Sequence, residues 1–129
     1  MPLVRITLQQ GRSAPELRRL ADIVQDVMLE HFAAPPGDRY QILEQLPVGS
    51  IIAEDTGLGI ERSEGVTIIH ITQQGRGDAQ KQAVYAALAE RLGEAGLVRP
   101  EDLIVSVVEN GREDWSFGHG RAQFLTGEL

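Results

Sequence analysis

The residue with the most unusual chemistry is the second of the chain. Removal of Met1 would leave Pro2 with a secondary amine, a basic nitrogen held in a rigid ring at the start of an apolar run. A neutral amine takes a proton from a carbon beside a carbonyl, whereas a protonated amine polarises a carbonyl and lets a β-carboxylate leave as carbon dioxide. Burial or a nearby cation favours the neutral form, and a nearby carboxylate favours the cation. The alternative is an ordinary proline at the head of a strand.

Two charged residues and a tyrosine have positions suited to binding. Arg76 follows Gly75 and precedes a predicted helix, where the backbone amides of the first helical turn also attract anions. We predict that Arg76 binds a substrate carboxylate; the alternative is a solvated arginine at a helix start. Asp38 follows Gly37, and aspartates in such turns usually hydrogen-bond to the nearby backbone. Tyr40 is either a hydrogen-bond donor to a substrate oxygen or a strand residue of the core.

The C-terminal tail, residues 111–129, contains the only tryptophan and two of the three phenylalanines. We predict that Trp115, Phe117 and Phe124 form an apolar wall that excludes water from a pocket. Packing of the tail against the core is the alternative, and one arrangement can serve both roles.

The sequence contains no recognisable set of metal ligands and no cofactor motif. It has no cysteine, which excludes disulfides and thiolate chemistry. His31, His70 and His119 fall on a predicted helix, on a predicted strand and between glycines, without the spacing of a shared metal site. Residues 57–59, Gly-Leu-Gly, lack the strand before and the helix after that a phosphate-binding loop requires. We therefore expect neither a metal nor a cofactor.

Length and charge narrow the classes of partner. A chain of 129 residues is expected to form a single domain, residues 1–129, with its own apolar core. Its net charge of -7 argues against binding to nucleic acid or to an anionic membrane. A small anionic substrate remains compatible, because screening over about 8–10 Å lets a local arginine outweigh the diffuse charge. The apolar runs are too short to span a membrane and the N-terminus does not resemble a signal peptide, so a cytoplasmic location is expected.

An internal repeat organises the chain. Residues 9–12, Gln-Gln-Gly-Arg, recur 64 positions later as residues 73–76. The same offset aligns Pro36 with Pro100 and Asp38 with Asp102 without a gap. These matches indicate duplication of one unit, with copies at about residues 2–46 and 66–110.

Each copy is predicted to be a strand, a helix and a strand. Strand-forming residues cover 3–8 and 66–72, helical periodicity covers 13–32 and 78–93, and strands return at 40–46 and 103–108. The fold class is therefore α/β: a four-stranded sheet with parallel pairing within each half and both helices on one face. Because the strands are apolar at successive positions, the other face also needs cover, and self-association would supply it.

A duplicated β-α-β unit that begins with Met-Pro resembles the tautomerase superfamily over nearly the whole chain. Within that superfamily, four segments resemble malonate semialdehyde decarboxylases: Gly-Asp-Arg-Tyr (37–40), Glu-Asp-Thr-Gly-Leu-Gly (54–59), Asp-Trp-Ser-Phe-Gly (114–118) and Phe-Leu-Thr-Gly (124–127). The resemblance implies the tautomerase fold and a homotrimer whose sheets line a central barrel, with active sites near the subunit boundaries. It also implies a catalytic Pro2 and an Asp38 that positions water or the Pro2 ammonium. Of two expected arginines, Arg76 matches the second, and Gln74 stands in place of the first.

These observations predict an enzyme that decarboxylates malonate semialdehyde or a similar small oxo acid without a cofactor, with Pro2, Asp38 and Arg76 as catalytic residues. Gln74, Tyr40 and the three aromatic residues of the tail would bind the substrate, and hydration of an activated acid is a side activity left open. The first alternative is a keto–enol tautomerase of the phenylpyruvate type. The second is a non-catalytic small-molecule-binding domain, because the same frame also serves as a sensor.

Overall fold

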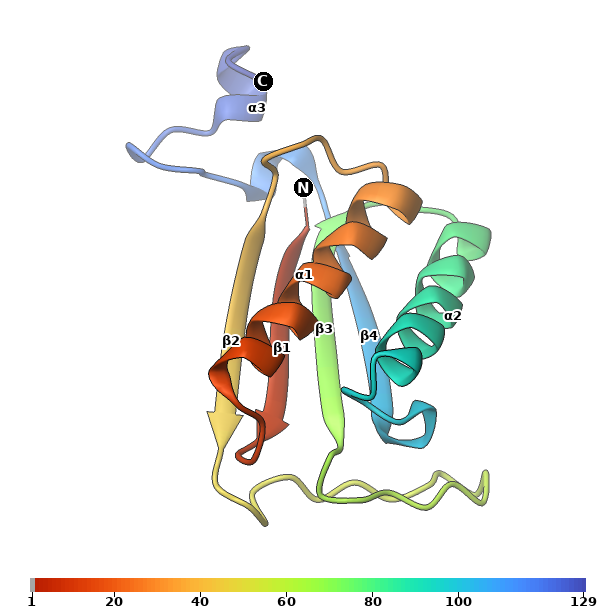
Figure 1. Cartoon of the computed structure of the whole chain (residues 1–129). Coiled ribbons are helices and arrows are strands. Elements are labelled where there is room, and N and C mark those ends of the chain that lie inside the picture. Colours follow the sequence, from red (N-terminus) through yellow and green to blue (C-terminus); the bar gives the residue numbers. More distant parts are fainter. Residues whose placement is uncertain (1) are drawn as a thin grey trace.

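The computed structural model describes residues 2–129, and Met1 lies outside the described residues. A four-stranded sheet carries two long helices on one face (Figure 1), which confirms the predicted architecture. In chain order the elements are β1 (Leu3–Gln9), α1 (Ala14–His31), β2 (Tyr40–Leu46), β3 (Thr67–Gln74), α2 (Asp78–Glu94), the 3-10 helix η1 (Pro100–Asp102), β4 (Leu103–Asn110), the 3-10 helix η2 (Arg112–Asp114) and α3 (Gln123–Thr126).

The order of the strands is β2-β1-β3-β4. β1 pairs in parallel with β2 and β3 pairs in parallel with β4, while β1 and β3 join the two pairs in an antiparallel contact. Each half of the chain is therefore a strand-helix-strand unit, as the repeat predicts. Because the join is antiparallel, corresponding parts of the two repeats lie at opposite ends of the sheet.

The two helices and the central strands form the core. α1 begins with a capping box, in which Ser13 Oγ accepts from the Glu16 N–H (3.3 Å) and Glu16 Oε1 accepts from the Ser13 N–H (2.9 Å). One apolar face of each helix then packs on the sheet, burying Val4, Ile6, Leu8, Leu20, Val24, Met28, Ile69, Ile71, Leu88 and Leu92. None of the helices in the described residues has the length and apolar composition needed to cross a membrane.

The opposite face of the sheet has no helix over it (Figure 1). Apolar and aromatic side chains remain open on the outer strands, with Tyr40 41% exposed, Ile42 40% exposed and Val108 54% exposed. Between β2 and β3, residues 47–66 run without helix or strand along one end of the sheet. The C-terminal tail leaves β4 at the other end, where the chain also begins. One end of the sheet is therefore next to residues 47–66 and the other end is next to the C-terminal tail. The residues predicted to form the active site lie at the end near the tail.

Candidate active site

Four strand ends meet where the chain begins (Figure 1). β1 and β2 start at this end, and β3 and β4 finish there. Pro2 precedes β1, Asp38 precedes β2, Gln74 is the last residue of β3, and Arg76 follows it. The fold therefore brings to one end of the sheet residues that are separated by up to about half the length of the chain.

Pro2 is buried directly before the first residue of β1. In the antiparallel register Leu3 lies opposite Thr72 and Val4 lies opposite Ile71. One further step of the same register puts Pro2 opposite Gln73. Removal of Met1, on which an amine at Pro2 depends, concerns a residue outside those described and stays a prediction.

Asp38 lies in the loop between α1 and β2 and is 5% exposed. Its backbone is fixed by a hydrogen bond from Gln25 Nε2 to the Asp38 carbonyl oxygen (3.2 Å). Burial raises the pKa of the Asp38 carboxyl above its ordinary value, and the positive charge of the amino terminus acts in the opposite direction. Asp38 is one of the residues that line a hollow of about 530 Å³, together with Tyr40 and Phe117.

The predicted aromatic residues form one continuous cluster. The Phe117 ring stacks on Tyr40 at 5.4 Å and on Trp115 at 5.4 Å, and meets Phe124 edge-on at 5.6 Å between ring centroids. Trp115 Nε1 donates to Asn110 Oδ1 (2.9 Å), which ties the cluster to the end of β4. The rings are only partly buried, so the tail both packs on the sheet edge and supplies aromatic surface to the hollow.

Some residues that line the hollow were not predicted from the sequence. Gln123, Glu128 and Leu129 complete its wall together with Pro35 and Pro36. The tail has no periodicity that could have predicted these contacts. One weak sequence signal was that Gln123 directly precedes Phe124, which was predicted to form part of the pocket wall.

Gln74 lies beside the aromatic cluster. It pairs in register with Asn110, whose side-chain oxygen accepts the hydrogen bond from Trp115. Gln74 Nε2 is buried and, within the described part of the chain, has no hydrogen-bond partner. A buried donor without an acceptor in the described chain is suited to bind a ligand oxygen.

Arg76 has a structural role that the sequence did not suggest. Its Nε and Nη2 donate to the Phe32 carbonyl oxygen at the end of α1 (3.1 and 2.9 Å). Its Nη1 donates to the carbonyl oxygens of Gln74 (3.2 Å) and Gly75 (3.1 Å). The guanidinium thus satisfies backbone acceptors where α1 and β3 end. Its binding to a substrate carboxylate stays a prediction.

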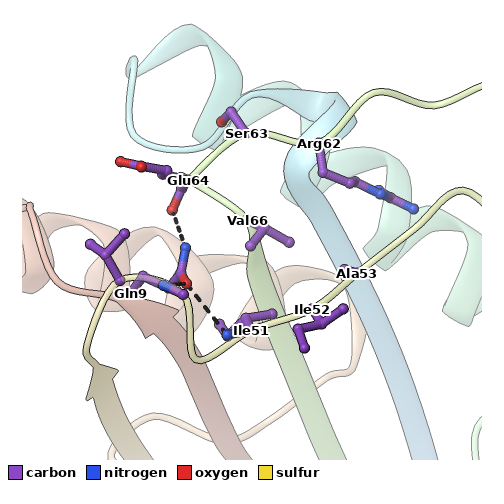
Figure 2. Close-up of a pocket in the computed structure, with 10 residues that line it drawn as sticks. Gln9, Ile51, Ile52, Ala53, Arg62, Ser63, Glu64 and Val66 are labelled. Atoms are coloured by element: carbon purple, nitrogen blue, oxygen red, sulfur yellow. Dashed lines mark hydrogen bonds between the residues drawn. The ribbon is translucent and has the colours of Figure 1, made fainter.

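The far end of the sheet carries Arg12 and Asp102, the repeat counterparts of Arg76 and Asp38. Arg12 donates to the Leu97 carbonyl oxygen (2.9 Å), beyond the end of α2, much as Arg76 does beyond α1. Asp102, the counterpart of Asp38, accepts from the Ser63 backbone N–H (2.7 Å), the Ser63 hydroxyl and Arg99 Nε (3.1 Å). The hollow at this end, about 540 Å³, is lined by Gln9 and by parts of the segments 48–53 and 62–66 (Figure 2), and by none of the predicted site residues.

The two buried aspartates should respond oppositely to replacement by asparagine. Ionised Asp38 is disfavoured in the folded state because its pKa is raised, so Asp38→Asn should increase the Tm at pH 7, and the gain should shrink as the pH falls towards 4. Burial alone would raise the pKa of Asp102, but hydrogen bonds from Ser63 and Arg99 outweigh burial and lower it. Asp102→Asn should therefore decrease the Tm at pH 7, with the loss shrinking below about pH 4. Thermal unfolding of both variants and of the wild-type protein at pH 4, 5.5 and 7 measures these changes in Tm. A lower Tm for Asp38→Asn at pH 7 would contradict a raised pKa for Asp38.

Within residues 2–129, no three His, Asp or Glu side chains are grouped closely enough to hold a metal ion.

Sequence comparisons place the chain among known proteins. Two family models, both described as tautomerase enzyme, match residues 38–118 and residues 2–60. The chain is 46% identical over 129 residues to probable tautomerase YrdN of Bacillus subtilis (strain 168), covering 100% of each protein. It is 36% identical over 126 residues to probable tautomerase YusQ of the same organism, covering 97% of this chain and 99% of YusQ.

Solved structures with the same fold include two malonate semialdehyde decarboxylases. One, described with its decarboxylase and hydratase activities, has a TM-score of 0.93 and 39% identity and covers 98% of both chains. The other, inhibited by 3-bromopropiolate, has a TM-score of 0.94 and 47% identity and covers 98% of this chain and 97% of its own. A fused 4-OT, described as an asymmetric trimer, has a TM-score of 0.75 and 25% identity and covers 96% of this chain and 98% of its own.

Proposed function

Because this chain belongs to the tautomerase enzyme family, we propose that it decarboxylates malonate semialdehyde or a similar small oxo acid through the amine of Pro2, without a cofactor. The observation that carries the proposal is the position of Pro2. It is buried at the same end of the sheet as Asp38 and the hollow that Tyr40 and Phe117 line. Nearly full-length similarity to two malonate semialdehyde decarboxylases supports the choice of substrate.

In the proposed reaction a cationic Pro2 amine faces the aldehyde oxygen of the substrate. The bond between the carboxylate carbon and its neighbour breaks, and the electron pair moves into the enolate of acetaldehyde as carbon dioxide leaves. The ammonium stabilises the negative charge that develops on the oxygen. A proton from solvent then adds to carbon and completes acetaldehyde. Arg76 and the Gln74 amide hold the carboxylate, and the aromatic cluster limits its hydration.

One feature favours keto–enol tautomerisation as a second candidate. Gln74 supplies a neutral amide where a decarboxylase-like site is expected to have an arginine, so the site has one cation fewer to hold a carboxylate. A charge-assisted hydrogen bond is about twice as strong as a neutral one. A neutral Pro2 amine could then act as a base that moves a proton between carbon and oxygen. The curated relatives, both called probable tautomerases, are consistent with this candidate.

The proposal includes a homotrimer. The face of the sheet opposite the helices leaves Tyr40, Ile42 and Val108 exposed, and a second or third copy of the chain would cover it. A fused 4-OT with the same fold is described as a trimer. Sheets that face inward around a threefold axis would bury these side chains and bring neighbouring subunits close to the sheet ends.

A comparison of two activities tests the function. Protein shown by light scattering to have a mass near three times 14.1 kDa would be assayed for carbon dioxide release from malonate semialdehyde and for ketonisation of phenylpyruvate enol. We expect the kcat/KM for decarboxylation to be the larger. The reverse order would support the tautomerase. Absence of both activities in a trimer with a free Pro2 amine would leave the non-catalytic binding domain as the interpretation.

A further inference from the structure

Gln73 is a buried polar side chain that the proposed mechanism does not use. It is 0% exposed, and neither Oε1 nor Nε2 has a hydrogen-bond partner in residues 2–129. Buried side-chain amides in folded proteins are nearly always hydrogen-bonded, because leaving both atoms without partners destabilises the fold. An amide in this state indicates that a group outside the described residues, or formed only after processing, completes its hydrogen bonds.

The counterpart of Gln73 in the other repeat shows what such an amide normally does. Gln9 Nε2 donates to the Glu64 carbonyl oxygen (3.0 Å), and Gln9 Oε1 accepts from the backbone N–H groups of Gly49 (2.7 Å) and Ile51 (3.3 Å). Figure 2 shows the Gln9 amide held between Glu64 and Ile51. Residues 47–66 therefore satisfy the amide at that end of the sheet. At the other end β1 starts at Leu3, and no comparable loop of the described chain bonds to the Gln73 amide.

The position of Gln73 relates it to Pro2. The antiparallel register of β1 and β3, continued by one residue, makes Gln73 the cross-strand neighbour of Pro2. Both are buried, on the same face as the core residues Val4 and Ile71. Directly opposite residues in an antiparallel pair have Cβ atoms about 4.5–5.5 Å apart, which is within reach of the long glutamine side chain.

We propose that Gln73 is a positioning residue for the amine of Pro2, and this inference rests on the proposed role of that amine. A protonated amine has only hydrogen-bond donors, and Gln73 Oε1 is an acceptor without a partner among residues 2–129. Their hydrogen bond orients the amine and favours its protonated form. Gln73 Nε2 then donates to an oxygen bound beside the amine, which is water in the resting enzyme.

Matched variants separate this role from simple core packing. In Gln73→Met, a side chain of similar length and volume loses only the hydrogen bonds to the amine and to water, so the Tm should fall less than in Gln9→Met. The pKa of the Pro2 amine should fall, the pH profile of kcat/KM should move with it, and kcat should drop roughly tenfold, as expected on losing one hydrogen bond to a charged group. Gln9→Met should lower the Tm because three hydrogen bonds are lost, while the Pro2 pKa and kcat stay unchanged.

The titration is read by NMR on protein labelled with nitrogen-15 proline, since only Pro2 among the six prolines would carry an ionisable amine. An unchanged Pro2 pKa and kcat in Gln73→Met would overturn the inference while leaving the proposed function in place. A wild-type protein without a titrating proline amine would overturn both. Should Gln73→Met not fold, Gln73→Leu provides the same readouts with another apolar side chain.

Discussion

Protein that retains a residue before Pro2 should have no detectable turnover. When Pro2 is joined to a preceding residue, its nitrogen belongs to an amide and is neither a base nor a cation at neutral pH, so either mechanism loses its reactive group. General acid–base groups contribute about 10²- to 10⁴-fold to rate, and the loss should be at least that large. The measurement compares kcat/KM for one preparation with an uncleaved N-terminal extension and another cleaved to expose Pro2, with intact mass defining each N-terminus.

The Pro2→Ala variant is expected to have an activity between those of the cleaved and the extended protein. It leaves a primary amine in nearly the same place, so activity should fall steeply, yet remain above that of the extended protein. Circular dichroism and light scattering should be unchanged in all three proteins, because Pro2 donates no backbone hydrogen bond within the sheet. Full activity with the extension still attached would contradict the whole mechanism.

Arg76→Ala should lose both stability and activity, whereas Arg12→Ala should lose stability alone. The two arginines bond to carbonyl oxygens in similar places, of Phe32 beyond α1 and of Leu97 beyond α2. Hydrogen bonds to charged groups contribute about 1.5–3 kcal/mol each, so both variants should lose a similar part of the free energy of unfolding. Only Arg76 lies at the Pro2 end, so only its loss should lower kcat/KM. We expect a fall of roughly 10- to 10²-fold, because one N–H of Nη2 is left to bond to a substrate carboxylate.

Urea unfolding measures the loss of stability, and kcat/KM calculated from the concentration of folded protein measures the loss of activity. The Arg12→Ala variant calibrates how much activity is lost through a loosened helix end alone. If Arg76→Ala and Arg12→Ala retain equal activity, Arg76 only supports the end of α1, and the carboxylate must bind elsewhere. This outcome would be compatible with the four backbone hydrogen bonds of Arg76, which already use most of its donors.

Local sequence patterns were sufficient for the four strands, the two long helices and the fold class, but they did not predict η1, η2 or α3. The capping box of Ser13 and Glu16, the helical spacing of Leu20 and Val24, and the prolines after Phe32 are interactions or constraints within a few residues. The repeat added the strand-helix-strand order of each half. The repeat did not predict the antiparallel join of β1 and β3, which places Gln9 and Gln73 at opposite ends of the sheet.

The different environments of residues at equivalent repeat positions were seen only in the tertiary structure. Asp38 and Asp102 share a repeat position, yet the pKa of one is raised and that of the other is lowered, because Ser63 and Arg99 reach only Asp102. Gln9 is satisfied by the loop over residues 47–66, whereas Gln73 lies beside Pro2 without a partner in the described chain. Apart from Arg99, which is three residues before Asp102, these differences arise from contacts between segments about 40–55 residues apart, such as Gln9 with Gly49 and Glu64. Local periodicity cannot encode such contacts, because they depend on which chain segment the folded sheet brings to each of its ends.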